Sequence, residues 1–291
     1  MNIASILCIF TTIITVSSQN VLKKYYNNRP NSSSIYLFSA ITVLSAWALF
    51  FVRSMITKTL TFDSVIIPYA IVFAVSYCLA SIFNLIAIQC GSLSLTSLIS
   101  SYSLIIPTAY GLIFDGDISN AKTSFYIGLA FLIISLFLIS NTSGKNKISL
   151  KWIICVLIAF IGNGACSTVQ PEQSEIFSGK YDDTFMVIAL AIVFIILFSL
   201  AIVKDRSVML PTIKSNSHIM IACGLSNGIA NLLIMVATGL SISKSLLFPL
   251  ISAGGIVITW LVSVFLYKEK LSKKQNMGLV FGIIAIVFLN I

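Results

Sequence analysis

The chain has 291 residues, of which 58% are hydrophobic and only 9% are charged, and its formal net charge is +9. Soluble domains carry about 25% charged residues, so this composition is typical of a protein whose solvent is lipid. The excess of bases does not indicate a nucleic-acid-binding face. Such a face needs clustered bases on a solvated surface, whereas the bases here lie in short connectors between apolar runs.

Apolar runs long enough to cross a bilayer divide the chain along its whole length. A hydrocarbon core about 30 Å thick needs roughly 20 apolar residues at the rise of an α-helix. Ten runs qualify, the last of them short: 3–22, 35–52, 65–88, 93–113, 123–140, 152–170, 184–203, 218–239, 245–267 and 276–291. We therefore predict an all-α membrane protein with ten transmembrane helices.

Two boundaries between runs fall in segments that are nearly free of charge. Segment 64–114 has no charged residue and is too long for one helix, so we predict a break at Gln89–Ser92. Segment 215–267 carries one formal charge, Lys244, and we predict that it divides at GLSISK. The charged stretch YKEKLSKK (267–274) is then the water-facing connector between the last two runs.

The basic residues suggest which connectors face the cytoplasm. None precedes the first run, whereas Lys23 and Lys24 follow it, so we interpret this run as a retained span and not as a signal peptide. Odd-numbered connectors hold thirteen of the 18 Lys and Arg residues. Under the positive-inside rule the odd connectors are cytoplasmic and both termini lie outside. The five bases in even-numbered connectors are Arg53, Lys58, Lys122, Lys180 and Lys244.

The two halves of the chain, 1–143 and 144–291, share one layout. Each has a charge-poor helical hairpin, then an acidic connector, then a closing helix that contains glycine. A shift of about 150 residues aligns Ser76 with Ser226 and Gly128 with Gly278. Five spans is an odd number, so the second half must enter the membrane from the opposite side. Inverted repeats of this kind are typical of secondary transporters.

The C-terminal segment FPLISAGGIVITWLVSVFLYKEKLSKKQNMGLVFGIIAIVFLNI (248–291) carries the most specific pattern. A proline-bearing helix precedes an E-x-L-S connector at Glu269, Leu271 and Ser272, and a helix led by Gly278 follows. In these features the chain resembles the drug/metabolite transporter superfamily, in its ten-span EamA-type branch. The resemblance implies a multi-pass transporter of the cell (inner) membrane with cytoplasmic termini, which is the reverse of the orientation that the bases favour. The first half repeats the pattern more loosely, with an aspartate shifted by one place, at Pro107, Asp117, Ile118, Ser119 and Gly128.

The sequence places no Asp, Glu, Lys or Arg well inside a predicted span. An intramembrane charge marks a proton or cation site, so we expect a neutral or zwitterionic cargo and not cation-for-proton exchange. Amides, hydroxyls and tyrosines remain, several of them at helical spacing on one face. The predicted cargo-binding residues are Tyr77, Ser81, Asn84, Ser100, Tyr102, Asn163, Ser167, Gln170, Asn227, Asn231 and Ser252.

A second interpretation of these polar groups stays open. Ser and Thr in membrane helices often bond their own backbone or support helix packing.

Pro107 and Pro249 are either hinges or fixed kinks. Lys244 and Glu172 are the charges nearest to a pocket mouth.

We expect a transporter, with export as the favoured direction, that moves a small metabolite such as an amino acid by alternating access. The alternative is a non-transporting membrane protein, such as a lipid-carrier translocation subunit or a sensor. GxxxG patterns at Gly224–Gly228 and Gly278–Gly282 predict close packing within the fold and leave a monomer or a homodimer open. No catalytic triad, acid pair or metal cluster occurs in the sequence, so we expect neither an enzyme nor a cofactor or metal.

Overall fold

The computed structural model describes residues 3–114, 123–140, 149–239 and 244–289, and within these ranges every regular element is helical. The elements in chain order are α1 (Ile3–Asn27), α2 (Ile35–Thr57), the 3₁₀ turn η1 (Ser64–Ile66), α3 (Ile67–Cys90), α4 (Leu93–Ser101), the 3₁₀ turn η2 (Tyr102–Leu104), α5 (Ile105–Phe114), α6 (Thr123–Ser140), α7 (Leu150–Ile176), α8 (Asp182–Lys204), α9 (Met209–Gly239), α10 (Lys244–Phe265) and α11 (Lys273–Leu289).

The described part of each predicted apolar run is mostly helical, and several helices are longer than their runs. Helix α1 continues to Asn27, α7 continues through Pro171 to Ile176, and α9 begins at Met209. Charged and polar residues at a membrane surface remain helical while the backbone hydrogen bonds persist, so loss of hydropathy does not mark the helix end. The predicted repeat boundary at 143/144, the connector motif 117–119 and residues 240–243 of the GLSISK break lie outside the described residues.

The fourth run is not one continuous α-helix. The α-helical hydrogen bonding stops at Ser101, passes through the 3₁₀ turn η2 and resumes at Ile105. Pro107 lies just beyond this turn, and a proline has no N–H to donate to the carbonyl four residues earlier. The break is thus a kink in the middle of the run. Pro249 is the other proline considered as a hinge or kink, and its side chain lies outside the described part of α10.

Among the residues that the structure describes, six helices are long and apolar enough to cross a membrane. Three further apolar helices are shorter: Leu93–Pro107, Thr123–Ile139 and Leu250–Phe265. This confirms the prediction of an all-α, multi-pass membrane protein. The six long segments are Ile6–Asn27, Ile35–Thr57, Ser64–Cys90, Leu150–Ile176, Asp182–Lys204 and Met209–Ile234.

Large apolar side chains point outward from many helices. Ile133 and Phe137 of α6 are 60% and 63% exposed, and Ile161 of α7 and Ile195 of α8 are 60% and 62% exposed. A monomeric soluble protein rarely exposes apolar surface on this scale. Lipid tails are the solvent that suits these faces.

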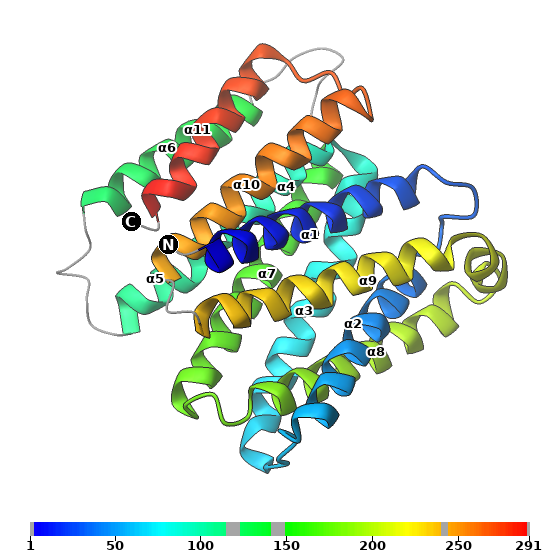
Figure 1. Ribbon diagram of the computed structural model, residues 1–291. Helices are drawn as coiled ribbons and strands as arrows, with labels where there is room; N and C mark the ends of the chain where they lie inside the picture. Colours follow the sequence, from blue (N-terminus) through cyan, green and yellow to red (C-terminus); the bar gives the residue numbers. More distant parts are fainter. Residues whose placement is uncertain (1–2, 115–122, 141–148, 240–243, 290–291) are drawn as a thin grey trace.

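Helices from the two halves of the chain pack against one another throughout. Helix α1 lies between α9 and α10, and α7 lies between α3 and the α4–α5 run. Figure 1 shows α6 beside α11 at one end of the molecule and α2 beside α8 at the other end. The halves are therefore interleaved in one membrane domain.

Glycines allow several of these helix pairs to approach closely. A Cβ on Gly224 of α9 would overlap the carbonyl oxygen of Thr42 in α2. A Cβ on Gly278 of α11 would lie 3.1 Å from the Ser135 carbonyl oxygen of α6, and one on Gly282 would overlap the Tyr102 hydroxyl. The prediction that these GxxxG patterns pack within the fold is confirmed.

The close approach of α9 to α2 predicts a stability difference between two glycine substitutions. Gly224→Ala should destabilise the protein by about 1–3 kcal/mol, because the added methyl group forces the helices apart. Gly255→Ala is the matched control, since the nearest heavy atom to its Cβ, Val16 Cγ1, lies at 3.8 Å. The measurement is the melting temperature of each variant in detergent. Equal melting temperatures for the two variants would contradict the prediction.

Candidate functional site

The end of α1 differs from the sequence-based prediction in a way that changes the site. We expected the first span to end at residue 22, which places Lys23 and Lys24 in a connector. Instead, the helix runs to Asn27, and both lysines belong to its last two turns. No helix breaker occurs before Pro30, and lysine is a good helix former. Helix α1 therefore extends five residues beyond the predicted run, and both lysines lie on it close to its end.

Lys23 belongs to a polar group that joins three helices. Its Nζ donates to Oδ1 of Asn84 in α3 at 3.1 Å. The Nδ2 of Asn84 donates to Oγ of Ser100 in α4 at 3.0 Å. Asn84 is only 5% exposed, so this amide finds its partners inside the protein, as a group removed from water must.

A second polar group joins α1, α3 and α9. The Tyr77 hydroxyl donates to Oδ1 of Asn227 at 3.2 Å, and Nδ2 of Asn227 donates to Oε1 of Gln19 at 2.9 Å. Nδ2 of Asn231 donates to the carbonyl oxygen of Asn227 at 2.9 Å. This group brings side chains of both halves of the chain into contact.

The two groups form one continuous feature. Gln19 and Lys23 are four residues apart on α1, and Tyr77 and Asn84 are seven residues apart on α3, so each pair shares a helix face. The two levels are separated by about 6 Å along α1, and partly buried Ser81 lies between the levels on α3. We call the feature the polar track and define it as Gln19, Lys23, Tyr77, Asn84, Ser100, Asn227 and Asn231.

The structure joins five of the eleven predicted residues to this track and places others elsewhere. Tyr102 is buried, and its hydroxyl lies 2.5 Å from Oγ of Ser135 in α6, which donates to the Gly278 carbonyl at 2.6 Å. Tyr102 therefore supports the packing of α6 and α11. The remaining predicted residues are partly buried, on α3 (Ser81), on α7 (Asn163, Ser167 and Gln170) and on α10 (Ser252).

Two members of the track, Lys23 and Gln19, were missing from the predicted set. Their spacing of four residues on one helix face was the available signal. This spacing was not recognised, because the lysine pair was interpreted as the end of the span. Gln19 was already inside the predicted run, and a search for the first helix breaker, Pro30, would have kept Lys23 in the same helix.

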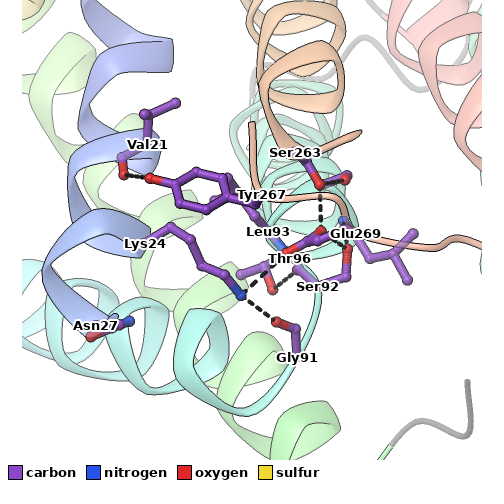
Figure 2. Close-up of polar contacts among 12 residues, drawn as sticks. Val21, Lys24, Asn27, Gly91, Ser92, Leu93, Thr96, Ser263, Tyr267 and Glu269 are labelled. Carbon is purple, nitrogen blue, oxygen red and sulfur yellow. Dashed lines mark hydrogen bonds and ion pairs between the residues drawn. The ribbon is translucent and has the colours of Figure 1, made fainter. Parts of the chain in front are cut away.

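Figure 2 shows a network around Glu269 that includes Lys24, the residue that follows Lys23 of the polar track in α1. The Glu269 carboxylate accepts from the Ser92 hydroxyl at 2.8 Å, from the Leu93 N–H at 3.0 Å and from the Ser263 hydroxyl, and it pairs with the Lys24 ammonium at 3.2 Å. The carboxylate thus caps the first turn of α4, where free N–H groups and the helix dipole favour a negative charge.

Two more contacts tie α1 to the same network, as Figure 2 shows. Nζ of Lys24 donates to the carbonyl oxygen of Gly91 at 3.4 Å, and the Tyr267 hydroxyl donates to the carbonyl oxygen of Val21 at 3.0 Å. We define the closure cluster as Val21, Lys24, Gly91, Ser92, Leu93, Ser263, Tyr267 and Glu269. It links α1 and the α3–α4 turn to α10 and the connector that follows α10.

The electrostatics of the closure cluster favour an ionised Glu269. Burial alone raises the pKa of this carboxyl. Hydrogen bonds from Ser263, from the Leu93 N–H and from Ser92, together with the Lys24 ammonium, outweigh burial and hold the pKa below its ordinary value. A depressed pKa stabilises the folded state above the ordinary value, and this contribution is lost as the pH falls through the lowered pKa.

The other acids near the helix ends are also paired. Asp183 at the start of α8 bonds Arg53 of α2 and accepts from the Thr59 hydroxyl at 2.6 Å. Asp205, after α8, accepts from the Ser34 hydroxyl at 2.7 Å, just before α2 begins. These acids fasten α2 to α8 at both ends and do not reach the polar track.

A hollow of about 270 Å³ lies at the opposite end of α3 from the closure cluster. Pro68 and Tyr69 of α3, Tyr110 of α5, and Thr168 and Glu172 of α7 contribute to its lining. Glu172 was predicted to be one of the two charges nearest a pocket mouth, and it lies here. The side chain of the other, Lys244, is outside the described residues. The hollow and the Glu269 network therefore lie at opposite ends of α3.

Comparison with known proteins identifies a fold and no function. No protein-family model matches the sequence, and no curated protein sequence matches it. The structure is similar to a solved structure described only as the crystal structure of a protein. The TM-score is 0.65, and the sequences are 12% identical over 99% of this chain and 96% of that chain. At this identity the likeness establishes a shared fold along nearly the whole chain.

The Glu269 network predicts a pH-dependent loss of stability. Glu269→Gln should destabilise the protein by about 1.5–3 kcal/mol at pH 7, because charge-assisted hydrogen bonds are lost. The difference from the unmodified protein should shrink as the pH falls below the ordinary range of a carboxyl pKa, because the carboxyl of the unmodified protein is then protonated. The measurement is the melting temperature as a function of pH, with exposed Lys270→Gln in the same connector as the control. A difference that stays constant down to pH 3 would count against the assigned role.

Proposed function

We propose that the chain is a ten-span transporter of the drug/metabolite transporter superfamily, EamA type, in the cell (inner) membrane. It moves a small neutral or zwitterionic metabolite by alternating access. The observation that carries the proposal is the polar track, in which residues of α1, α3 and α4 from the first half meet residues of α9 from the second half. A cargo site between two halves is the arrangement that secondary transporters use.

The pattern of helix pairing supports two equivalent five-helix halves. If α1, α2, α3, the α4–α5 run and α6 are exchanged with α7, α8, α9, α10 and α11, the packing of α1 on α9 becomes that of α7 on α3. Likewise, α1 on α10 becomes α7 on the α4–α5 run, and α2 on α9 becomes α8 on α3. The pairs α2–α8 and α6–α11 map onto themselves. This symmetry, with an odd number of spans per half, supports the inverted repeat.

The closure cluster supports alternating access. It fastens α1 and the α3–α4 turn of the first half to α10 and the following connector of the second half. Its contacts are hydrogen bonds and one ion pair, which water can replace when the halves rock apart. Opening of the closure cluster would then give a cargo access to the polar track from that side of the molecule.

The hollow favours the second candidate, a membrane protein that handles a lipid-like carrier and not a water-soluble metabolite. Pro68, Tyr69, Val72 and Val169 give it a mainly apolar wall. An acyl or prenyl chain suits such a surface, and Glu172 at the same site can accept hydrogen bonds from a polar headgroup. Metabolite transport is the better supported function, because the amides of the track lie away from these lining residues.

Amide substitutions in the track should separate the two candidates. Asn84→Ala and Asn227→Ala should each lower counterflow of the cargo in liposomes by about tenfold or more, because a buried partner loses its hydrogen bond. Asn28→Ala, an exposed asparagine just after α1, is the control. The assay uses the purified chain and panels of amino acids, sugars and nucleosides, and membrane insertion is checked for each variant.

No counterflow with any panel would count against transport. Counterflow with unchanged kinetics in both track variants would remove Asn84 and Asn227 from the site. Activity toward a lipid-linked substrate alone would favour the second candidate.

A further inference from the structure

Lys23 is a basic residue that has no acidic partner in the described part of the protein. In the residues that the structure describes, no carboxylate lies within 4.0 Å of its Nζ, whereas the adjacent Lys24 pairs with Glu269 and Arg53 pairs with Asp183. The partner of Lys23 is a neutral amide oxygen, Oδ1 of Asn84. Among the described residues, Lys58 and Lys204 at other helix ends have no such partner either, but they are exposed, whereas Lys23 is partly buried.

The surroundings of Lys23 are those of a binding site and not of a solvated surface. The side chain is partly buried within α1, beside buried Asn84 and buried Cys223. A charge in a membrane-spanning region is costly unless a partner or a polar cavity compensates it. The Asn84 amide gives Lys23 a hydrogen bond without giving it a countercharge, so this position attracts an anion.

We propose that Lys23 binds the carboxylate of the transported metabolite. The proposal rests on the proposed function and narrows its cargo to carboxylate-bearing molecules, with amino acids favoured. On binding, the carboxylate replaces Oδ1 of Asn84 as the partner of the ammonium, and the Ser100 hydroxyl lies next to it. A lysine suits this role because its flexible stem lets the ammonium follow the cargo.

The other level of the track completes the recognition of an amino acid. About one helical turn from Lys23, the side-chain oxygens of Gln19 and Asn227 and the Tyr77 hydroxyl are acceptors for a cargo amine. These groups are neutral, so they accept hydrogen bonds without demanding a second charge. The ammonium of Lys23 repels a simple organic cation, which lacks the carboxylate.

The test measures melting temperatures of the purified full chain in detergent with three sets of probes. The first set is L-alanine, L-serine, L-leucine and L-phenylalanine, the second is their amides, and the third is acetate, lactate and isovalerate. The amino acids should raise the melting temperature by about 2–4 °C, because a ligand of the folded state stabilises it. The amides should give no shift. A rise in melting temperature with the third set would show that a carboxylate without an amine is sufficient for binding.

Three variants localise the effect. Lys23→Gln should abolish the shift in melting temperature, and Lys23→Arg should keep part of it. Lys214→Gln is the control and should leave the shift unchanged, because Lys214 is exposed near the start of α9 and belongs to neither the polar track nor the closure cluster. The melting temperature without probe, together with the size-exclusion profile, checks that each variant is folded.

Equal shifts with the amino acids and their amides, or a full shift in Lys23→Gln, would overturn the assignment. So would the absence of a shift with every carboxylate. If counterflow of a sugar or nucleoside persists in that case, the transport function stands while the carboxylate site falls. If both assays are negative, both proposals fail.

Discussion

A polar group inside a membrane must find its hydrogen-bond partner within the protein, because the lipid tails offer none. The organisation of the interior follows from this constraint. The amide oxygen of Asn84 accepts from Lys23, and its nitrogen donates to Ser100. In the same way, the amide oxygen of Asn227 accepts from Tyr77, and its nitrogen donates to Gln19. Each amide therefore ties together helices that are far apart in the sequence.

The positions of the helices follow from the sequence, since the bilayer thickness sets the length of each apolar run. The end of α1 does not follow in the same way. Lys23 and Lys24 lower the hydropathy of the segment, but they do not break a helix, and Asn84 and Glu269 supply the partners that allow both to stay in it. Hydropathy reports where side chains prefer water, whereas the helix end is decided by backbone hydrogen bonds.

The candidate site was predictable in part for a similar reason. Helical spacing placed Tyr77 with Asn84 and Asn227 with Asn231 on common faces, and the structure joins these stripes. Spacing on one helix does not fix the rotation of its neighbour. That rotation depends on contacts such as Gly224 against Thr42, which the sequence does not display. Tyr102 illustrates the point: it lies two residues from Ser100, so it faces another direction and packs against α6 and α11.

Through its two lysines, helix α1 links the closure cluster to the polar track. Successive residues of an α-helix point about 100° apart, so Lys24 reaches the connector after α10 while Lys23 reaches Asn84 in the interior. The last turns of α1 form one continuous helix, so a movement of the backbone at one lysine also moves the other. If Lys23 binds the carboxylate of a cargo as proposed, its movement away from Asn84 would act on the same segment that Glu269 holds. Lys23 and Lys24 are adjacent residues, so the proposed binding would have a direct mechanical route to the Lys24–Glu269 ion pair.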